Sequence, residues 1–194
     1  TRLWETAPAL IAQLDAARAE GIDITADIYP YTYWQSHMMV LLPQRDPTDL
    51  NAIRFVLQEL APPDGIIFTH FPVRPEVVGK TLTEVARLVG KSPADTFSWL
   101  AQESVAHTLK TGEAGDMMIG TSMTEADVHA LMLWPHTNLC TDGSLLDGHP
   151  RGAGSFPRVL GRYVRDLGLL PLEQAIHKMT GLPAEHMGFT QRGK

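Results

Sequence analysis

Segments with the period of a β-strand alternate along this chain with segments of helical period, and this alternation limits the possible folds more than any other feature. The run "IDITADIYPY" over residues 22–31 places Ile22, Ile24 and Ala26 at every second position before Pro30 ends the pattern. The other strand-like runs are "GIIFTH" (65–70), "DMMIGTS" (116–122) and "TNLCT" (137–141). Strands that alternate with helices are typical of a parallel sheet, open or closed, so we predict an α/β fold.

Helical periodicity and capping residues mark the segments between these strands. Asp46 or Thr48 is expected to cap the helix in 46–60, and Thr124 with Asp127 the helix that follows Met123. The predicted helices are 9–21, 46–60, 81–90, 92–104, 123–135, 155–168 and 172–180. We expect the strands near 22–29, 116–121 and 137–141 to be parallel neighbours, with 40–112 a mostly helical excursion between them.

Polar residues follow two of the predicted strands. Tyr29 ends the first, and Asp142 comes directly after "TNLCT". The carboxyl ends of parallel strands share one face, so these side chains should share a rim, with Arg151 in the glycine-containing loop beyond. Its planar guanidinium could bind a ligand's carboxylate. Spacing alone equally allows Asp142 to cap a "DGS" turn and Arg151 to be solvated.

Charge and cysteine content exclude several classes of protein. The 194 residues carry a formal charge of −6, and their basic residues are scattered, which argues against a nucleic-acid surface. There is neither an apolar stretch of membrane-spanning length nor a signal-peptide pattern, so we expect a cytoplasmic protein with no membrane partner. The single cysteine, Cys140, excludes an intrachain disulfide, and its apolar surroundings favour a buried, unreactive thiol.

Several longer strings resemble one enzyme family. They are "DIYPY" (27–31), "GKTLTEVARLVGKSPADTF" (79–97), "TDGS" (141–144), "HPRGAGSFPRVLGRYVRDLGLLPLEQAIHKMTGLPAEHMGF" (149–189) and "QRG" (191–193). In this order they are similar to the C-terminal half of the N-acyl-D-amino-acid deacylases, or D-aminoacylases, of the amidohydrolase superfamily. The resemblance implies part of a TIM-barrel-like, metal-dependent hydrolase. It divides the chain into a barrel helix and strand (1–39), an insertion (40–112), and the last barrel strands with closing helices (113–194).

The resemblance also implies roles for individual residues. Asp142 would lie beside the zinc as a metal-site residue, accept a proton from the attacking water and pass it to the leaving amine, as a carboxylate in that position can do. Tyr29 would contact the substrate, and Arg151 would bind the α-carboxylate of an N-acyl-D-amino acid. Met123 would line the side-chain pocket. His149 shares the "HPR" motif with Arg151, but a structural role in the turn is favoured over a catalytic one.

The chain departs from the family pattern after "YPY". A small, glycine-containing "AGS" stretch is common there, whereas this chain reads "TYWQSHMM". Gln35 or Ser36 would therefore replace the family's polar substrate contact, and Trp34 adds bulk. His70 ends a predicted strand inside the insertion, and we favour a structural role for it over metal binding.

The histidines leave the metal site incomplete. None of the eight forms an H-x-H or H-x-x-H pair, although the family holds its metal with such a pair and further histidines. We therefore expect a fragment of a zinc-dependent deacylase with its other ligands upstream, zinc in the parent enzyme, and neither zinc nor activity in the fragment alone. The alternative is a non-catalytic remnant that self-associates through open sheet edges.

Overall fold

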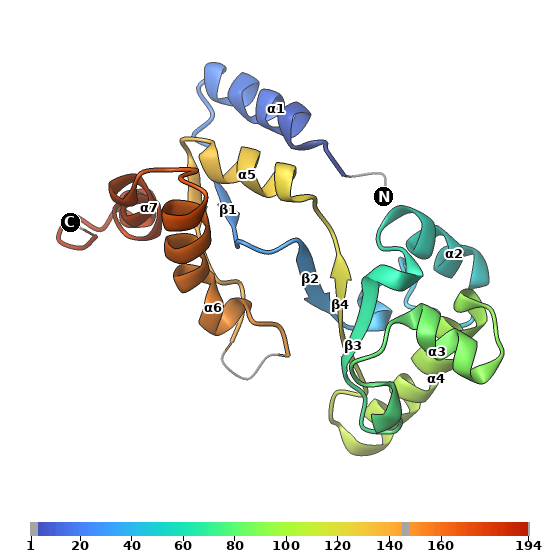
Figure 1. Cartoon of the computed structure of the whole chain (residues 1–194). Coiled ribbons are helices and arrows are strands. Elements are labelled where there is room, and N and C mark those ends of the chain that lie inside the picture. Colours follow the sequence, from blue (N-terminus) through green and yellow to red (C-terminus); the bar gives the residue numbers. More distant parts are fainter. Residues whose placement is uncertain (1–3, 145–147, 194) are drawn as a thin grey trace. The chain divides into compact units, whose positions relative to one another are not determined.

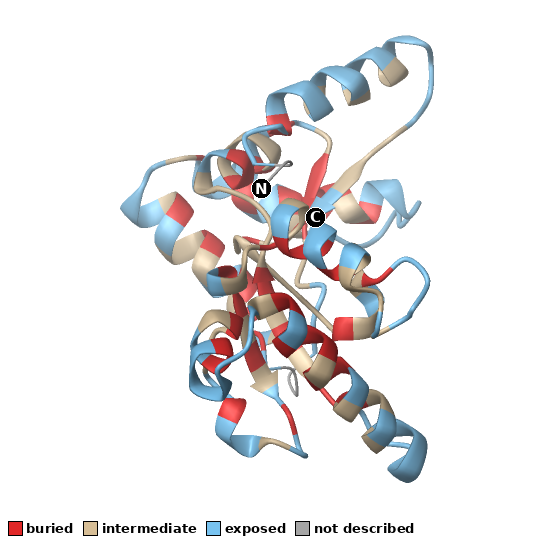
Figure 2. Cartoon of the chain, turned by 90° about the vertical axis from the view of Figure 1, so that its right-hand side faces the viewer, coloured by how far each residue is buried: buried red, intermediate tan, exposed pale blue. Residues whose placement is uncertain are grey.

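The computed structural model describes residues 4–144 and 148–193, which form two compact units. The inserted unit is Tyr33–Ser122, and the terminal unit combines Trp4–Thr32 with the chain from Met123 onward. Each unit has its own buried residues, while the outer helix faces are exposed (Figure 2). No helix among the described residues is both long and apolar enough to cross a membrane.

The terminal unit is built on two parallel strands, β1 (Ala26–Ile28) and β5 (Thr137–Leu139). Their register pairs Ala26 with Thr137 and Ile28 with Leu139. Helices precede and follow these strands (Figure 1). They are α1 (Ala7–Ala19), α5 (Glu125–Leu133), α6 (Arg151–Arg158), the π-helix η4 (Val159–Asp166), α7 (Leu172–Met179) and α8 (Gly181–His186). The parallel pair flanked by helices confirms the predicted α/β class.

The core of the terminal unit joins the strands to α5, η4 and α7. Ile28 and Leu139 contribute the strand side chains. The helical and loop contributions are Val128, Met132, Val159, Tyr163, Leu170 and Ala175. Because this core holds β1 against β5, it fixes which residues emerge at the carboxyl edge of the pair.

The inserted unit contains an antiparallel sheet in the order β2-β4-β3. Its strands are β2 (Tyr33–Ser36), β3 (Ile66–His70) and β4 (Met117–Thr121). Its helices are α2 (Leu50–Glu59), α3 (Leu82–Val89) and α4 (Pro93–Thr111), with short 3-10 turns η1 (Met38–Leu41), η2 (Pro63–Gly65) and η3 (Pro75–Val77). Alternate residues of β3, namely Ile66 and Phe68, are buried, as expected where helices cover one sheet face. Apart from this small sheet the insertion is mostly helical, as predicted.

The parallel pairing predicted for residues 116–121 is wrong. The strand exists as β4, but it pairs antiparallel with β2 and β3 and not with β5. Opposite Gly120 lies Trp34, whose indole ring occupies the space that a Cβ on Gly120 would need. The bulk that distinguishes "TYWQSHMM" therefore covers a glycine and favours this register. Because β2 and β4 pair within the inserted unit, that unit extends beyond the predicted 40–112 at both ends.

The start of α2 also corrects a prediction, whereas the predicted cap of Thr124 with Asp127 is confirmed at α5. Asp49, and not Asp46 or Thr48, caps α2 by accepting from the backbone N–H groups of Asn51 and Ala52. Asp46 instead accepts from Thr48 in the preceding turn. Several Asp and Thr residues precede this helix, so composition could not identify which of them occupies the cap.

Asp127 forms hydrogen bonds at the N-terminal ends of both α1 and α5. It completes a capping box with Thr124 at the start of α5. Its carboxylate also accepts the backbone N–H groups of Glu5 and Ala7, at 2.8 and 3.1 Å, where α1 begins. The residue is 3% exposed. Burial raises the pKa of this carboxyl, but the hydrogen bonds from Thr124, Glu5 and Ala7 outweigh burial and hold the pKa below its usual value.

Asp127→Asn is expected to lower the free energy of unfolding by about 2 kcal/mol at pH 7, because one acceptor oxygen and the charge are lost. A lowered folded-state pKa contributes stability above the unfolded pKa of about 4, and this contribution disappears as the pH falls through the folded value. Urea unfolding at pH 7 and pH 3 should therefore show a difference between wild type and variant that shrinks in acid. Glu84→Gln, in the exposed capping box of α3, is the control and should have a smaller effect. A difference that persists undiminished at pH 3 would contradict the assignment.

Candidate active site

Two predicted site residues leave the paired strands at the same edge. Tyr29 directly follows β1, and Asp142 lies just beyond β5. The backbone N–H of Cys140 donates to the Ile28 carbonyl at 2.9 Å, which continues the pairing past the strand ends. Both side chains thus belong to the carboxyl edge of a parallel pair, where α/β folds place their ligands. The shared rim predicted from the sequence is present.

Arg151, the first residue of α6, joins these two side chains. Its Nη1 lies 2.9 Å from Oδ2 of Asp142, and its guanidinium carbon lies 4.9 Å from the centre of the Tyr29 ring. Arg151 is 9% exposed, so it is not a solvated loop residue. The three residues that the sequence singled out therefore meet in one place.

Burial is uneven across this ion pair. The Asp142 side chain is 62% exposed and that of Arg151 is 11% exposed. The Nε atom of Arg151 is buried and has no hydrogen-bond partner among the described residues. A guanidinium with such a donor can bind a second anionic group beside Asp142, and the exposed carboxylate is accessible to solvent.

The backbone of Asp142 is in the left-handed region, with φ at 46°. Aspartate and asparagine tolerate this conformation better than most residues, because their short polar side chains can bond locally. Gly143 follows, and a Cβ there would crowd the Arg151 side chain. The chain bends at Gly143, and this backbone conformation presents the carboxylate of Asp142 to Arg151.

Burial changes the acid-base properties of the neighbouring groups. It raises the pKa of the Tyr29 phenol, although the Arg151 guanidinium acts in the opposite direction. Tyr29 therefore stays neutral at physiological pH and can donate a hydrogen bond. Burial, with the carboxylates of Asp27 and Asp142, raises the pKa of the Cys140 thiol to about 11. This thiol remains protonated, as expected of an unreactive cysteine, but Cys140 is half-buried and not buried as the sequence predicted.

His149 contacts both Tyr29 and Arg151 and is 3% exposed. Its Nδ1 accepts the backbone N–H of Arg151 at 3.0 Å. Its ring meets the Tyr29 ring edge-on at a centroid distance of 6.1 Å. These contacts support the structural role favoured from the sequence, with the bond directed at the residue expected to bind substrate.

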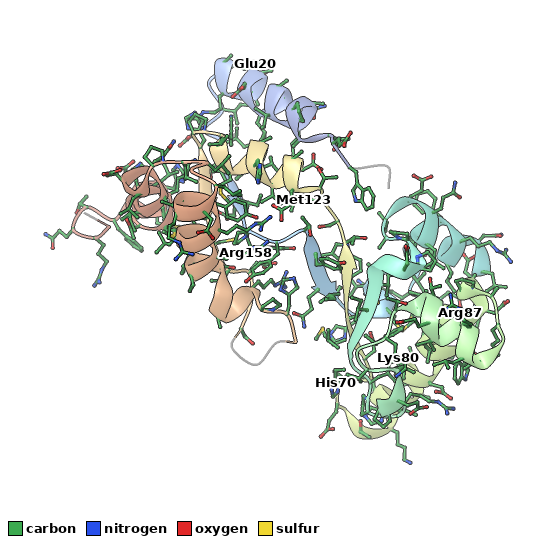
Figure 3. The ribbon with its side chains drawn as sticks, in the orientation of Figure 1. Glu20, His70, Lys80, Arg87, Met123 and Arg158 are labelled. Carbon is green, nitrogen blue, oxygen red and sulfur yellow. The ribbon has the colours of Figure 1, made fainter. Side chains whose placement is uncertain are left out.

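Met123 packs, partly buried, against the core of the terminal unit at the start of α5 (Figure 3). Its backbone N–H donates to the Thr32 carbonyl at 3.3 Å, which ties the end of the "YPYT" segment to this helix. Its role in a side-chain pocket remains a prediction.

Gln35 and Ser36 belong to β2 of the inserted unit. They line a pocket of about 320 Å³ together with Trp34, Leu41, Leu60 and Ser122. Both polar atoms of the Gln35 amide are buried without a hydrogen-bond partner among the described residues. Their contact with the substrate that Asp142 and Arg151 would bind remains a prediction.

The described residues provide no complete metal site. No group of three or more His, Cys, Asp and Glu side chains within 4–144 and 148–193 is arranged to hold a metal ion. His70, at the end of β3, is exposed (Figure 3). Because a catalytic zinc needs about three protein ligands, this part of the chain does not fit such an ion by itself.

Arg158 was missed from the sequence, and Tyr31, which the sequence places with Tyr29 at the end of the first predicted strand, was given no role in the site. The Arg158 guanidinium lies 4.9 Å from the Tyr31 ring centre, and its Nε donates to the Pro30 carbonyl at 2.7 Å. Arg158 projects from the end of α6 (Figure 3). The second tyrosine of "YPY" was the available signal, since it lies two residues after Tyr29 and so continues the same rim.

Known proteins resemble the chain over nearly its whole length. It is 34% identical over 193 residues to N-acyl-D-glutamate deacylase of Alcaligenes xylosoxydans xylosoxydans, which is 98% of this chain and 33% of that protein. It is 40% identical over 183 residues to D-aminoacylase of the same organism, covering 93% of this chain and 31% of the relative. No family model matches the chain.

Solved structures agree with these relatives. The crystal structure of N-acyl-D-glutamate deacylase from Bordetella bronchiseptica, complexed with zinc and a phosphonate mimic of the tetrahedral intermediate, matches with a TM-score of 0.73 at 33% identity. That match covers 98% of this chain and 34% of the other. A D-aminoacylase structure, described as defining a novel subset of amidohydrolases, matches with a TM-score of 0.70 at 31% identity, with the same two coverages. The chain thus spans about a third of the length of the relatives that it matches.

Proposed function

The chain is related over nearly its whole length to about a third of the N-acyl-D-amino-acid deacylases of the amidohydrolase superfamily, and we propose that it supplies the proton-transfer and carboxylate-binding residues of such an enzyme. The reaction is hydrolysis of the amide bond of an N-acyl-D-amino acid, giving a carboxylate and a free D-amino acid. The observation that carries the proposal is the meeting of Asp142, Arg151 and Tyr29 at the carboxyl edge of β1 and β5.

Asp142 carries out the proton transfers. Water adds through its oxygen to the amide carbonyl carbon, and the Asp142 carboxylate accepts the proton that the water releases. The carbon–nitrogen bond then breaks as Asp142 returns this proton to the departing amine nitrogen. The 62% exposure of its side chain leaves the carboxylate accessible for both steps.

Arg151 and Tyr29 bind the substrate in this scheme. The buried guanidinium, whose Nε has no hydrogen-bond partner in the described part of the chain, offers a charge-assisted hydrogen bond to the α-carboxylate. Tyr29 stays neutral and lies against the same guanidinium, so its hydroxyl can donate to an adjacent oxygen of the substrate. A fixed carboxylate orients the amide relative to Asp142, which is the main benefit of a positioning contact.

Zinc belongs to this proposal through the relatives. The N-acyl-D-glutamate deacylase structure contains zinc, and a further D-aminoacylase structure is described as addressing the functional role of a binuclear metal centre. A zinc ion would polarise the carbonyl and the attacking water when bound. Asp142 offers at most one ligand, and the described residues provide no group of three. Further ligands would have to come from a region equivalent to the rest of the relatives.

The test combines metal analysis with a substrate panel. The full-length protein is expected to contain zinc and to hydrolyse N-acetyl-D-amino acids but not their L-enantiomers, whereas the 194-residue chain after dialysis should contain no stoichiometric zinc. A zinc-loaded full-length protein that hydrolyses no member of the D panel would refute the proposed reaction. Stoichiometric zinc in the short chain would refute the shared metal site.

Self-association is the alternative function. Among the described residues β1 and β5 form a sheet of only two strands, and unpaired strand edges can pair with a second copy. Sedimentation of the chain distinguishes self-association from the hydrolase function. A stable dimer of the chain, together with no hydrolysis by the full-length protein, would favour self-association.

A further inference from the structure

We propose that His149 and Tyr31 are positioning residues that hold Arg151 and Tyr29 in the geometry needed to bind the substrate carboxylate. This inference rests on the proposed function and deepens it. Its basis is a continuous row of five side chains in the terminal unit, here called the ring ladder: Arg151, Tyr29, His149, Tyr31 and Arg158.

Each member of the ring ladder contacts the next. The Arg151 guanidinium lies 4.9 Å from the Tyr29 ring centre, and the rings of Tyr29 and His149 are 6.1 Å apart at an interplanar angle of 71°. His149 and Tyr31 follow at 5.2 Å and 89°, and the Arg158 guanidinium closes the row 4.9 Å from the Tyr31 ring centre. Edge-to-face rings and guanidinium–ring contacts are both attractive. The orientation of Tyr29 therefore depends on rings that lie behind it.

His149 acts on Arg151 in a second way, through the backbone. Its Nδ1 accepts the N–H of Arg151 at 3.0 Å, so Nδ1 carries the lone pair and the ring proton lies on Nε2. A side-chain acceptor bonded to the N–H two residues later closes a turn, as Asn and Asp side chains often do. Because His149 is 3% exposed, water cannot easily replace this bond.

The far end of the ring ladder is anchored. The Tyr31 hydroxyl lies against Gly154 of α6, in the space that a Cβ there would take. Arg158 donates to the Pro30 carbonyl at 2.7 Å and reaches Glu125 at 3.3 Å. Tyr31 is thus held on both sides, which lets it support the His149 ring.

Two substitutions separate the two contributions of His149. Asparagine at 149 can place its amide oxygen near Nδ1 and keep the bond to the Arg151 N–H, but it removes the ring. His149→Phe keeps a ring between the tyrosines but removes the acceptor. The matched controls are His186→Asn and His186→Phe, at an exposed histidine of the same unit.

The first readout is hydrogen exchange at the Arg151 backbone amide, measured on the chain without substrate. Exchange in His149→Phe should be at least roughly tenfold faster than in wild type, because a buried donor loses its partner. The exchange rate of this amide in His149→Asn should stay within about threefold of the wild-type rate. A threefold change in rate corresponds to a smaller free-energy difference than the loss of a hydrogen bond. Equal protection in wild type and His149→Phe would overturn the positioning role whatever the activity.

The second readout is the division between KM and kcat in the full-length enzyme. Both His149→Phe and Tyr31→Leu should raise KM for N-acyl-D-amino acids roughly tenfold with kcat changed by less than about threefold, since the carboxylate contact is misplaced while Asp142 remains. His149→Asn should recover part of the KM lost in His149→Phe. If His149→Phe does not fold, His149→Gln takes its place and must show the same rise in KM. The amide of glutamine occupies the position of Nε2, so the Arg151 N–H still loses the acceptor that Nδ1 supplies. An unchanged KM in the folded variants would overturn the inference, whereas a wild-type protein without hydrolysis would refute only the proposed function.

Discussion

Replacement of Asp142 by asparagine in the full-length protein is expected to lower kcat by roughly 10²–10⁴-fold and to leave KM nearly unchanged, because the proposed role of the residue is proton transfer in the chemical step. Asparagine is the appropriate substitution here. It keeps the size of the side chain and tolerates the left-handed backbone at φ 46°, where alanine would add strain. Steady-state kinetics on one N-acyl-D-amino acid measure both constants.

Asp166→Asn is the matched control for this experiment. Asp166 is an exposed carboxylate paired with Arg165 at 2.7 Å, and its loss should change neither constant. A fall of less than tenfold in kcat for Asp142→Asn, in a protein with normal metal content, would show that another group transfers the proton.

Arg151→Ala is expected to weaken transition-state binding of the N-acyl-D-amino acid by roughly 2–5 kcal/mol, mostly as a higher KM, because a charge-assisted contact to the carboxylate is lost. An N-acyl amine without the carboxylate should react equally poorly with the wild type and the variant. Arg151→Lys keeps the charge but lacks the planar guanidinium, so its KM for the N-acyl-D-amino acid should lie between those of the wild type and Arg151→Ala.

The reaction rate of the carboxylate-free amide with the wild type and with Arg151→Ala tests this prediction. If Arg151→Ala slows that amide as much as the acid, Arg151 supports the loop and does not bind substrate. Arg165→Ala, at an exposed arginine of the same unit, controls for the general loss of positive charge.

These two variants should not be independent. Arg151 Nη1 lies 2.9 Å from Asp142 Oδ2, so each residue influences the position of the other. Contacting residues typically show coupling energies of roughly 0.5–3 kcal/mol in a double-mutant cycle. The double variant should therefore lose less catalytic efficiency than the two single losses added together.

Local sequence signals were sufficient to predict most helices and strands of this protein. The capping box of Thr124 with Asp127 starts α5 where the spacing of these two residues predicted it. The short apolar runs in "GIIFTH" and "DMMIGTS" predicted β3 and β4, and both strands occur. These features depend on contacts between residues a few positions apart, which a sequence displays directly.

The position of the candidate site was also within reach of the sequence. Tyr29 and Asp142 follow strands that were recognised individually, and parallel strands bring their carboxyl ends to one edge whatever lies between them. The loop length then limits how far Arg151 can lie from Asp142. Family resemblance added roles to these residues, but their meeting follows from strand direction.

Tertiary structure alone decided which partners those elements take. β4 pairs antiparallel with β2 and β3, because a strand's period shows which face is buried but not which edge it meets. The contact of Trp34 with Gly120 joins residues far apart in the chain, as does that of Arg158 with Pro30. The ring ladder depends on the same kind of contact, since His149 is placed between Tyr29 and Tyr31 only once α6 has packed against the segment 29–31. The sequence thus determined where the candidate site residues occur, and long-range packing determined which neighbours bury them, orient them and shift their pKa values.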